Sequence, residues 1–137
     1  MNAISPKVRR AARERAMQFL FGLEFTAYSW EEVLDQFWDS HPARASVRAY
    51  ADSLVRGVME HREELDAIID GALDRWTPDR VGRIERNVLR VALYEMRYGD
   101  NVPTSVAMNE AIEVVKQFGT DESPAFINAV LDRVKDQ

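Results

Sequence analysis

The residues of this chain that are best suited to chemistry are arginines close to its start. Five of the first fifteen residues are basic and only Glu14 is acidic; the basic residues are Lys7, Arg9, Arg10, Arg13 and Arg15. This segment therefore carries +4 on a chain of net charge −5, so the remaining residues sum to −9. A basic arm on an acidic body indicates a polyanionic partner, and nucleic acid is the first candidate.

One predicted helix carries the basic arm. Ser5 is a favoured N-cap and Pro6 a favoured first helical residue, so we predict a helix over residues 5–25. An apolar stripe repeats along it at helical spacing and comprises Val8, Ala12, Ala16, Phe19 and Leu23. The basic residues must therefore lie beside this stripe or opposite it.

Three arginines and two apolar residues share one edge of the stripe. Arg9, Arg10 and Arg13 lie along its first half, and Met17 and Phe21 continue the same edge. Guanidinium groups bind phosphates through paired hydrogen bonds or stack on unpaired bases, and an aromatic ring further along the edge is suited to base stacking. The alternative is a solvated charged face without a ligand. Basic residues at a helix N-terminus oppose the helix dipole, which favours a role other than stability.

A second arginine cluster lies between residues 75 and 97 and comprises Arg75, Arg80, Arg83, Arg86, Arg90 and Arg97. Arg83, Arg86 and Arg90 are three or four residues apart and share one helix face. If this helix packs beside the first one, its arginines extend the edge that contains Arg10 into one groove. The alternative, which we favour for Arg90 and Arg97, is pairing with acidic neighbours four residues away.

The constellations typical of enzymes are missing. The chain has two histidines and no cysteine, too few ligands for a structural zinc site, and it lacks Glu-x-x-His, phosphate-loop and dinucleotide-binding patterns. Asp121 and Glu122 are an acid/base couple only in principle, because a solvated pair before the helix start Ser123-Pro124 explains them better. The polar pair Asn109-Glu110 in an otherwise apolar helix also has a simpler explanation than catalysis: a neighbouring helix or water supplies its hydrogen-bond partners. We expect no enzyme activity, cofactor or metal.

Composition and hydropathy indicate one all-α domain spanning residues 1–137. A chain with 46% hydrophobic and 30% charged residues is typical of a soluble globular protein, and no apolar run approaches the length of a membrane span or signal peptide. The absence of cysteine agrees with a reducing compartment, so we expect a cytoplasmic protein. Start signals and periodicity predict a compact bundle of about seven helices, near residues 5–25, 29–38, 43–60, 62–75, 78–98, 104–118 and 124–134.

Two blocks of sequence carry a family resemblance and together cover about half of the chain. The first is Arg9-Arg10-Ala-Ala-Arg13-Glu14-x-Ala16-x-Gln18-x-Leu20. The second comprises Gly82, Ile84-Glu85-Arg86-x-Val-Leu-Arg-x-Ala-Leu-Tyr94-Glu95, Val102-Pro103, Asn109-Glu110-Ala111, Lys116-x-Phe118-Gly119 and Ser123 to Leu131. On these residues the chain resembles the NusB family of bacterial transcription antitermination factors. Residues 27–75 resemble the family only in helical pattern.

The resemblance implies two packed helical subdomains without enzyme activity. Members of the family bind single-stranded boxA RNA of ribosomal RNA transcripts together with NusE, a protein of the small ribosomal subunit. The pair helps to assemble an antitermination complex on RNA polymerase. Some members are dimers, and the sequence does not decide whether exposed apolar surface is covered by NusE or by a second copy.

The basic clusters and the resemblance together give candidate RNA-binding residues, namely Lys7, Arg9, Arg10, Arg13, Phe21, Arg83, Glu85, Arg86 and Phe126. The resemblance implies that Asp121 and Glu122 lie at the NusE contact. Phe21 stands where the family often has tyrosine, so stacking is kept but the hydroxyl is lost. Glu85 would repel phosphate but can accept a hydrogen bond from a base amino group, which favours a role in specificity. Ala11 interrupts an arginine triplet found in some members, which predicts somewhat weaker phosphate binding.

Two other functions remain open from the residues. A related helical domain occurs as an RNA-binding appendage of ribosomal RNA methyltransferases, but 137 residues leave no room for their cofactor-binding domain, so we do not expect such an enzyme. The second is a protein-binding adaptor whose arginines dock on an acidic partner. Competition by RNA would separate this adaptor from an RNA-binding protein.

Overall fold

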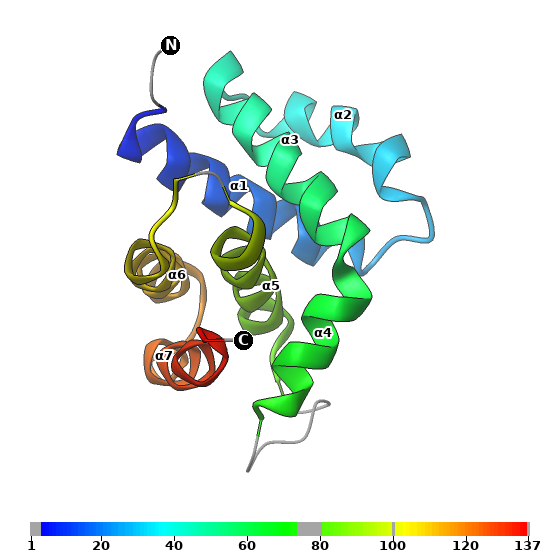
Figure 1. The fold of residues 1–137 in the computed structure, drawn as a ribbon. Coiled ribbons are helices and arrows are strands. Elements are labelled where there is room, and N and C mark those ends of the chain that lie inside the picture. Colours follow the sequence, from blue (N-terminus) through cyan, green and yellow to red (C-terminus); the bar gives the residue numbers. More distant parts are fainter. Residues whose placement is uncertain (1–3, 74–80, 100, 137) are drawn as a thin grey trace.

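The computed structural model describes residues 4–73, 81–99 and 101–136, and within these ranges it contains seven α-helices and no strand (Figure 1). The helices are α1 (Pro6–Leu23), α2 (Trp30–Ser40), α3 (Ala45–Glu60), α4 (Arg62–Gly71), α5 (Arg83–Tyr98), α6 (Thr104–Phe118) and α7 (Ser123–Val134). The prediction of an all-α bundle is confirmed.

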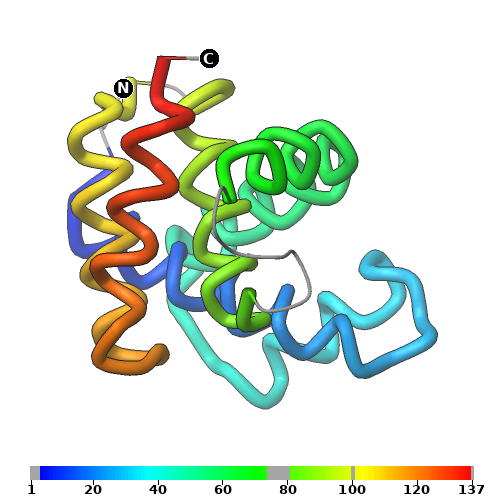
Figure 2. The backbone as a smooth tube through the Cα atoms, turned by 90° about the horizontal axis from the view of Figure 1, so that it is seen from below, coloured from blue at the N-terminus to red at the C-terminus, as the bar shows by residue number. Residues whose placement is uncertain are grey.

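The helices form two groups that share α5 as their centre. In the first group α1 runs along α3, α2 packs beside α1, and α4 follows the end of α3 and packs against α5. In the second group α5, α6 and α7 pack in succession (Figures 1 and 2). The helix α5 also contacts α1, α3 and α4, so one apolar core joins both groups. This core includes Leu20 of α1, Leu54 of α3, Leu89 of α5 and Leu131 of α7. The arrangement fixes α1, which carries the basic arm, between α3 and the second group.

The first helix begins as its sequence predicts. The backbone N–H of Val8 donates to the Ser5 hydroxyl at 3.2 Å, and Pro6 occupies the first turn. At the other end the backbone N–H of Phe25 donates to the carbonyl of Gly22 at 3.1 Å. The chain therefore turns away from the helix axis two residues before the predicted end.

The start of α5 differs from its prediction. Val81 lies before the helix and Gly82 is its extended N-cap, with φ −62° and ψ 151°, so the predicted helical position of Val81 is wrong. A Cβ on Gly82 would lie 2.1 Å from Oε1 of Glu85, because that side chain folds back over the helix start. The predicted start Thr77-Pro78 and the predicted core position of Trp76 lie outside the described residues. Gly99 ends the helix as predicted.

Candidate nucleic-acid interface

The exposed part of the basic arm centres on Arg10. Its guanidinium donates to both oxygens of Glu110 on α6, with Nε–Oε1 at 3.0 Å and NH2–Oε2 at 2.6 Å, while 50% of its side chain remains exposed. The hydrogen bond from Arg10 is the main reason why the pKa of Glu110 is lowered. The prediction that a neighbouring helix supplies a hydrogen-bond partner for Glu110 is confirmed. Arg10 keeps further N–H donors that can bind a phosphate.

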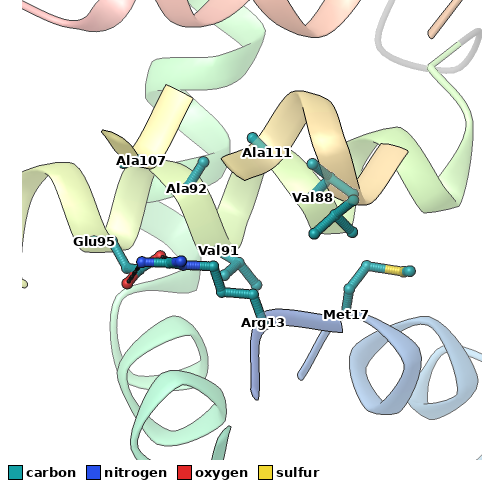
Figure 3. A pocket seen from close by; sticks show the side chains of 9 residues that line it. Arg13, Met17, Val88, Val91, Ala92, Glu95, Ala107 and Ala111 are labelled. Carbon is teal, nitrogen blue, oxygen red and sulfur yellow. Dashed lines mark hydrogen bonds and ion pairs between the residues drawn. The ribbon is translucent and has the colours of Figure 1, made fainter. Parts of the chain in front are cut away.

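Arg13 lies inside the protein rather than on the exposed edge that its spacing predicts. Only 5% of its side chain is exposed, and its Nε and NH2 donate to the two oxygens of Glu95 at 2.6 and 3.1 Å. A third donor reaches Glu110 at 3.3 Å. Figure 3 shows the Arg13 side chain extending from α1 toward Glu95. The prediction of a surface position is therefore wrong, because Glu95 compensates the charge that burial would otherwise leave unpaired.

Tyr50 of α3 ties Arg9 to the same carboxylate. Arg9 NH1 donates to the Tyr50 hydroxyl at 2.8 Å, and its guanidinium carbon lies 4.9 Å from the centre of the ring. The hydroxyl in turn donates to Glu95. Burial, together with this bond to Glu95, raises the pKa of Tyr50 to about 12. The hydroxyl therefore stays protonated, and holds Arg9, throughout the physiological pH range.

We call this set the α1 charge network; its members are Arg9, Arg10, Arg13, Tyr50, Glu95 and Glu110. Sequence reasoning did not single out Tyr50 or Glu95 as functional. The sequence does contain a signal for Glu95. This acid lies on the apolar stripe of α5 between Ala92 and Met96, where a buried carboxylate requires a cationic partner. The sequence contains no such signal for Tyr50, since a tyrosine among apolar residues is compatible with an ordinary core position.

The network does not enclose a ligand site. A narrow gap between α1, α5 and α6 is lined by Arg13, Met17, Val91 and Ala111, among others, and its volume is about 10 Å³ (Figure 3). This is space for about one water molecule. Any ligand of the basic arm must therefore bind at the surface, where Arg10 and Lys7 are exposed.

Three arginines of α5 bind carboxylates on α4. Arg86 NH2 lies 2.8 Å from Asp70, Arg90 Nε lies 2.8 Å from Asp66, and Arg97 pairs with Glu64 at 3.0 Å. The prediction that Arg90 and Arg97 pair with acids four residues away is therefore wrong, because their partners lie on the neighbouring helix α4.

The proposed single arginine groove is not formed. Helix α1 crosses α5 at a large angle (Figure 1). Arg13 near the start of α1 bonds Glu95 near the end of α5, whereas Glu24 after the end of α1 bonds Asn87 near the start of α5. Arg10 faces α6 and Arg86 faces α4, on opposite sides of α5 (Figure 1). The prediction that Arg10 and Arg86 share one groove is wrong, because the two arginines face different neighbours of α5.

A hollow of about 370 Å³ lies where α5 and α7 begin. Its lining includes Val81, Gly82, Glu85, Thr120, Glu122, Ser123 and Phe126. The Ser123 hydroxyl donates to Glu85 and accepts from the backbone N–H of Thr120 at 2.9 Å, which fixes the Glu85 carboxylate. The structure thus brings together Glu85, Phe126 and Glu122. The exposed Asp121 is adjacent in sequence.

The end of α1 carries the aromatic residues of the basic edge. Phe21 is partly buried and meets the exposed Phe25 edge to face, with ring centres 5.3 Å apart. The Arg83 guanidinium lies 4.7 Å from the centre of the Phe25 ring. Candidate residues therefore occur at both ends of α1, with Arg9 and Arg10 at one end and Phe21 and Arg83 at the other.

Two classes of site are not found. In residues 4–73, 81–99 and 101–136 no helix is long and apolar enough to cross a membrane. Over the same residues no three side chains of the metal-binding types cluster closely enough to hold an ion.

Comparison with known proteins decides the family. A model described as the NusB family matches residues 10–136. The chain belongs to the NusB family. A transcription antitermination protein NusB of Geobacter sulfurreducens is 45% identical over 127 residues, 92% of each chain. Transcription antitermination is therefore the role of this chain at the level of its family.

Solved structures agree on the fold. NusB of T. maritima superposes with a TM-score of 0.85 at 32% identity, covering 98% of this chain and 94% of that one. A structure described as antitermination factors NusB and NusE in complex with dsRNA superposes with a TM-score of 0.84. It covers 96% of this chain and 98% of the matched chain at 23% identity, a likeness of fold alone. The expected NusB-like arrangement of helices is confirmed.

Proposed function

We propose that this NusB-family protein binds single-stranded boxA RNA of ribosomal RNA transcripts together with NusE, and helps to assemble an antitermination complex on RNA polymerase. The observation that carries the proposal is the placement of Arg9 and Arg10 beside exposed Lys7 at one end of α1. Tyr50 holds the first guanidinium and Glu110 holds the second. Guanidinium groups that are already ordered lose less conformational entropy when they bind phosphate.

Arg13 contributes to this site through its position rather than by contact. Its donors are engaged by Glu95 and Glu110, so it fixes the carboxylates that orient Arg9 and Arg10. Arg86 is similarly occupied by Asp70 and Asp66 of α4, so we place it in the helix interface rather than among the direct RNA contacts.

Base recognition belongs to the other end of α1 and to the hollow. Phe21 and Phe126 offer aromatic surface, and the fixed Glu85 carboxylate can accept from a base amino group while it disfavours phosphate. Unpaired strands suit such contacts, because their bases are free to stack on side chains.

The acidic pair at the start of α7 suits the protein partner. Asp121 and Glu122 are exposed, and Glu122 lines the same hollow as Glu85 and Phe126. We therefore place the NusE contact next to the base-reading surface, so that RNA and NusE adjoin. A fold-related structure contains NusB and NusE in complex with dsRNA, which supports an assembly of such a protein with NusE and RNA.

Fluorescence anisotropy with a labelled boxA strand at near-physiological salt tests the proposal. We expect tighter binding than to a scrambled strand of the same composition, because bases as well as phosphates are contacted. Equal and weak binding to both strands, abolished by moderate salt, would contradict it. An acidic protein ligand that binds the arginine end and is not displaced by RNA would instead support the adaptor.

A further inference from the structure

Phe25 is an aromatic residue that the protein leaves on its surface. It follows the end of α1, and 62% of the residue is exposed. Its ring is nevertheless held, because Phe21 meets it edge to face at 5.3 Å and the Arg83 guanidinium covers it at 4.7 Å. A single exposed apolar residue is common on protein surfaces. This ring differs because an aromatic ring and a guanidinium hold it while most of the residue stays open to a ligand.

Arg83 differs from the other arginines of α5. Arg86, Arg90 and Arg97 are each bound to a carboxylate of α4. Arg83 is exposed, and within the part of the chain that the structure describes it has no carboxylate partner. Its charge is therefore available to an anionic ligand, and its planar group already lies against an aromatic ring.

A buried amide links the two segments that carry this pair, through the Glu24 carboxylate on one side and the Arg83 carbonyl on the other. Asn87 is fully buried, and its Nδ2 donates to Glu24 at 2.9 Å and to the Arg83 carbonyl at 2.8 Å. These bonds join the residue before Phe25 to the first turn of α5. The hydrogen bonds therefore tie the end of α1 to the first turn of α5, which favours one relative placement of the ring and the guanidinium.

We infer that Phe25 and Arg83 form a stacking site for one unpaired nucleobase of RNA. The ring supplies the stacking surface, and the guanidinium stacks on the same base or holds its phosphate. A nucleotide is the occupant that matches both parts, because it joins a planar base to an anion. The site also continues the edge of α1 that runs from Arg10 to Phe21. The inference rests on the proposed function and adds a contact residue, Phe25, to it.

A strand that carries 2-aminopurine at each position in turn tests the site, because stacking on a ring quenches the fluorescence of this base. Phe25→Leu keeps an apolar side chain but removes the aromatic face. We expect quenching by the wild-type protein at one position to disappear in Phe25→Leu, with affinity for the single strand lower by roughly fivefold or more. Arg83→Gln should weaken binding to the same strand.

Arg56→Gln is a matched control. Arg56 is also exposed, its guanidinium lies 5.5 Å from the Trp30 ring, and within the described residues it has no carboxylate partner. The variant removes the same charge from a different surface, so we expect wild-type affinity and quenching. A loss equal to that of Arg83→Gln would overturn the site, since net charge alone would then explain it.

The outcomes separate this inference from the proposed function. Stacking tolerates any base sequence, so the quenching test also works with a scrambled strand. Failure of the wild-type protein to prefer boxA would contradict the proposed function only. Unchanged affinity and quenching in Phe25→Leu would overturn the stacking site. Weaker NusE binding by Phe25→Leu, with RNA quenching intact, would also overturn it and assign the ring to a protein contact.

Discussion

At the scale of single residues, arginines with the same sequence signature have different environments. Arg10 and Arg13 are one turn apart on the same predicted edge, yet one is half-exposed and the other buried. The difference comes from carboxylates on other helices, since Glu95 lies deep in the packing of α1 against α5 and Glu110 lies near the surface. Helical spacing predicts which side of a helix a residue occupies, but the neighbouring helix decides its burial.

Replacement of Arg10 tests the phosphate contact. Arg10→Ala removes an exposed guanidinium, so we expect weaker binding to the boxA strand and a salt dependence that is flatter by about 0.7 in the log–log slope, the value for one phosphate contact of a single strand. Titrations at four salt concentrations measure it, with Arg56→Gln as the charge-matched control. A slope identical to that of the wild type would count against this contact.

Glu110 orders the Arg10 guanidinium, but its carboxylate also occupies two of the donors that a phosphate would use. A glutamine amide can still accept a hydrogen bond from the guanidinium, so it keeps part of this order and removes the competing charge. Glu110→Gln weakens the ion pair, so we expect RNA binding to tighten roughly threefold, consistent with a partly exposed pair. The gain should be smaller in an Arg10→Ala background, because the released guanidinium is then missing. An equal gain in both backgrounds would show that Glu110 acts only by general repulsion.

The same carboxylate predicts a pH dependence of stability. Hydrogen bonds from Arg10 lower the pKa of Glu110, so the pair stabilises the folded state above the ordinary carboxyl pKa and loses this effect as pH falls through the lowered value. We expect Glu110→Gln to cost about 1 kcal/mol at pH 7 and less below pH ~4. Urea unfolding at both pH values measures the difference; a constant difference would refute the assignment.

At the scale of elements, α5 is held to three of its neighbours by different kinds of contact. Buried charge joins it to α1 through Arg13 and Glu95, surface ion pairs join it to α4, and close packing joins it to α3. The sequence predicted most helix starts, because Ser5-Pro6 and the capping box at Ser29 act locally. It did not predict the start of α5, where the extended Gly82 and the returning Glu85 side chain precede the helix.

The Arg13–Glu95 pair should be strongly coupled. Glu95→Ala leaves the Arg13 guanidinium buried with a partial partner, so we expect a loss of about 3 kcal/mol in the free energy of unfolding. Arg13→Ala should cost a similar amount, and the double variant should cost clearly less than the sum of the two. Additive losses would indicate that the two side chains do not act as a pair.

Close packing of α3 on α5 gives a second prediction for the elements. A Cβ on Gly57 would lie 2.0 Å from Cζ of Tyr94, so Gly57→Ala must displace that ring. We expect a loss of about 2 kcal/mol, as for other overpacked sites. Adding Tyr94→Leu should recover part of the loss, because the obstructing ring is then absent. Gly71→Ala is the control, since a Cβ there meets nothing within 4 Å.

At the scale of the whole molecule, the sequence predicted the all-α class and the resemblance predicted the family, because helical periodicity and family motifs are both local patterns of the sequence. Only part of the candidate site could be predicted from the sequence. Glu85, Phe126 and Glu122 come from segments far apart in sequence, and the fold assembles them around one hollow. The predicted groove between Arg10 and Arg86 is not formed, since no local sequence pattern encodes how α1 and α5 pack on each other.

The central claim is that one surface of this protein reads boxA RNA next to NusE. The most direct measurement is the affinity for labelled boxA and scrambled strands with NusE absent and present. We predict selective binding to boxA that tightens when NusE is added, and by thermodynamic linkage an equal tightening of NusE when boxA is added. Equal affinity for both strands, unchanged by NusE, would contradict the account and reduce the arginines of α1 to general electrostatics.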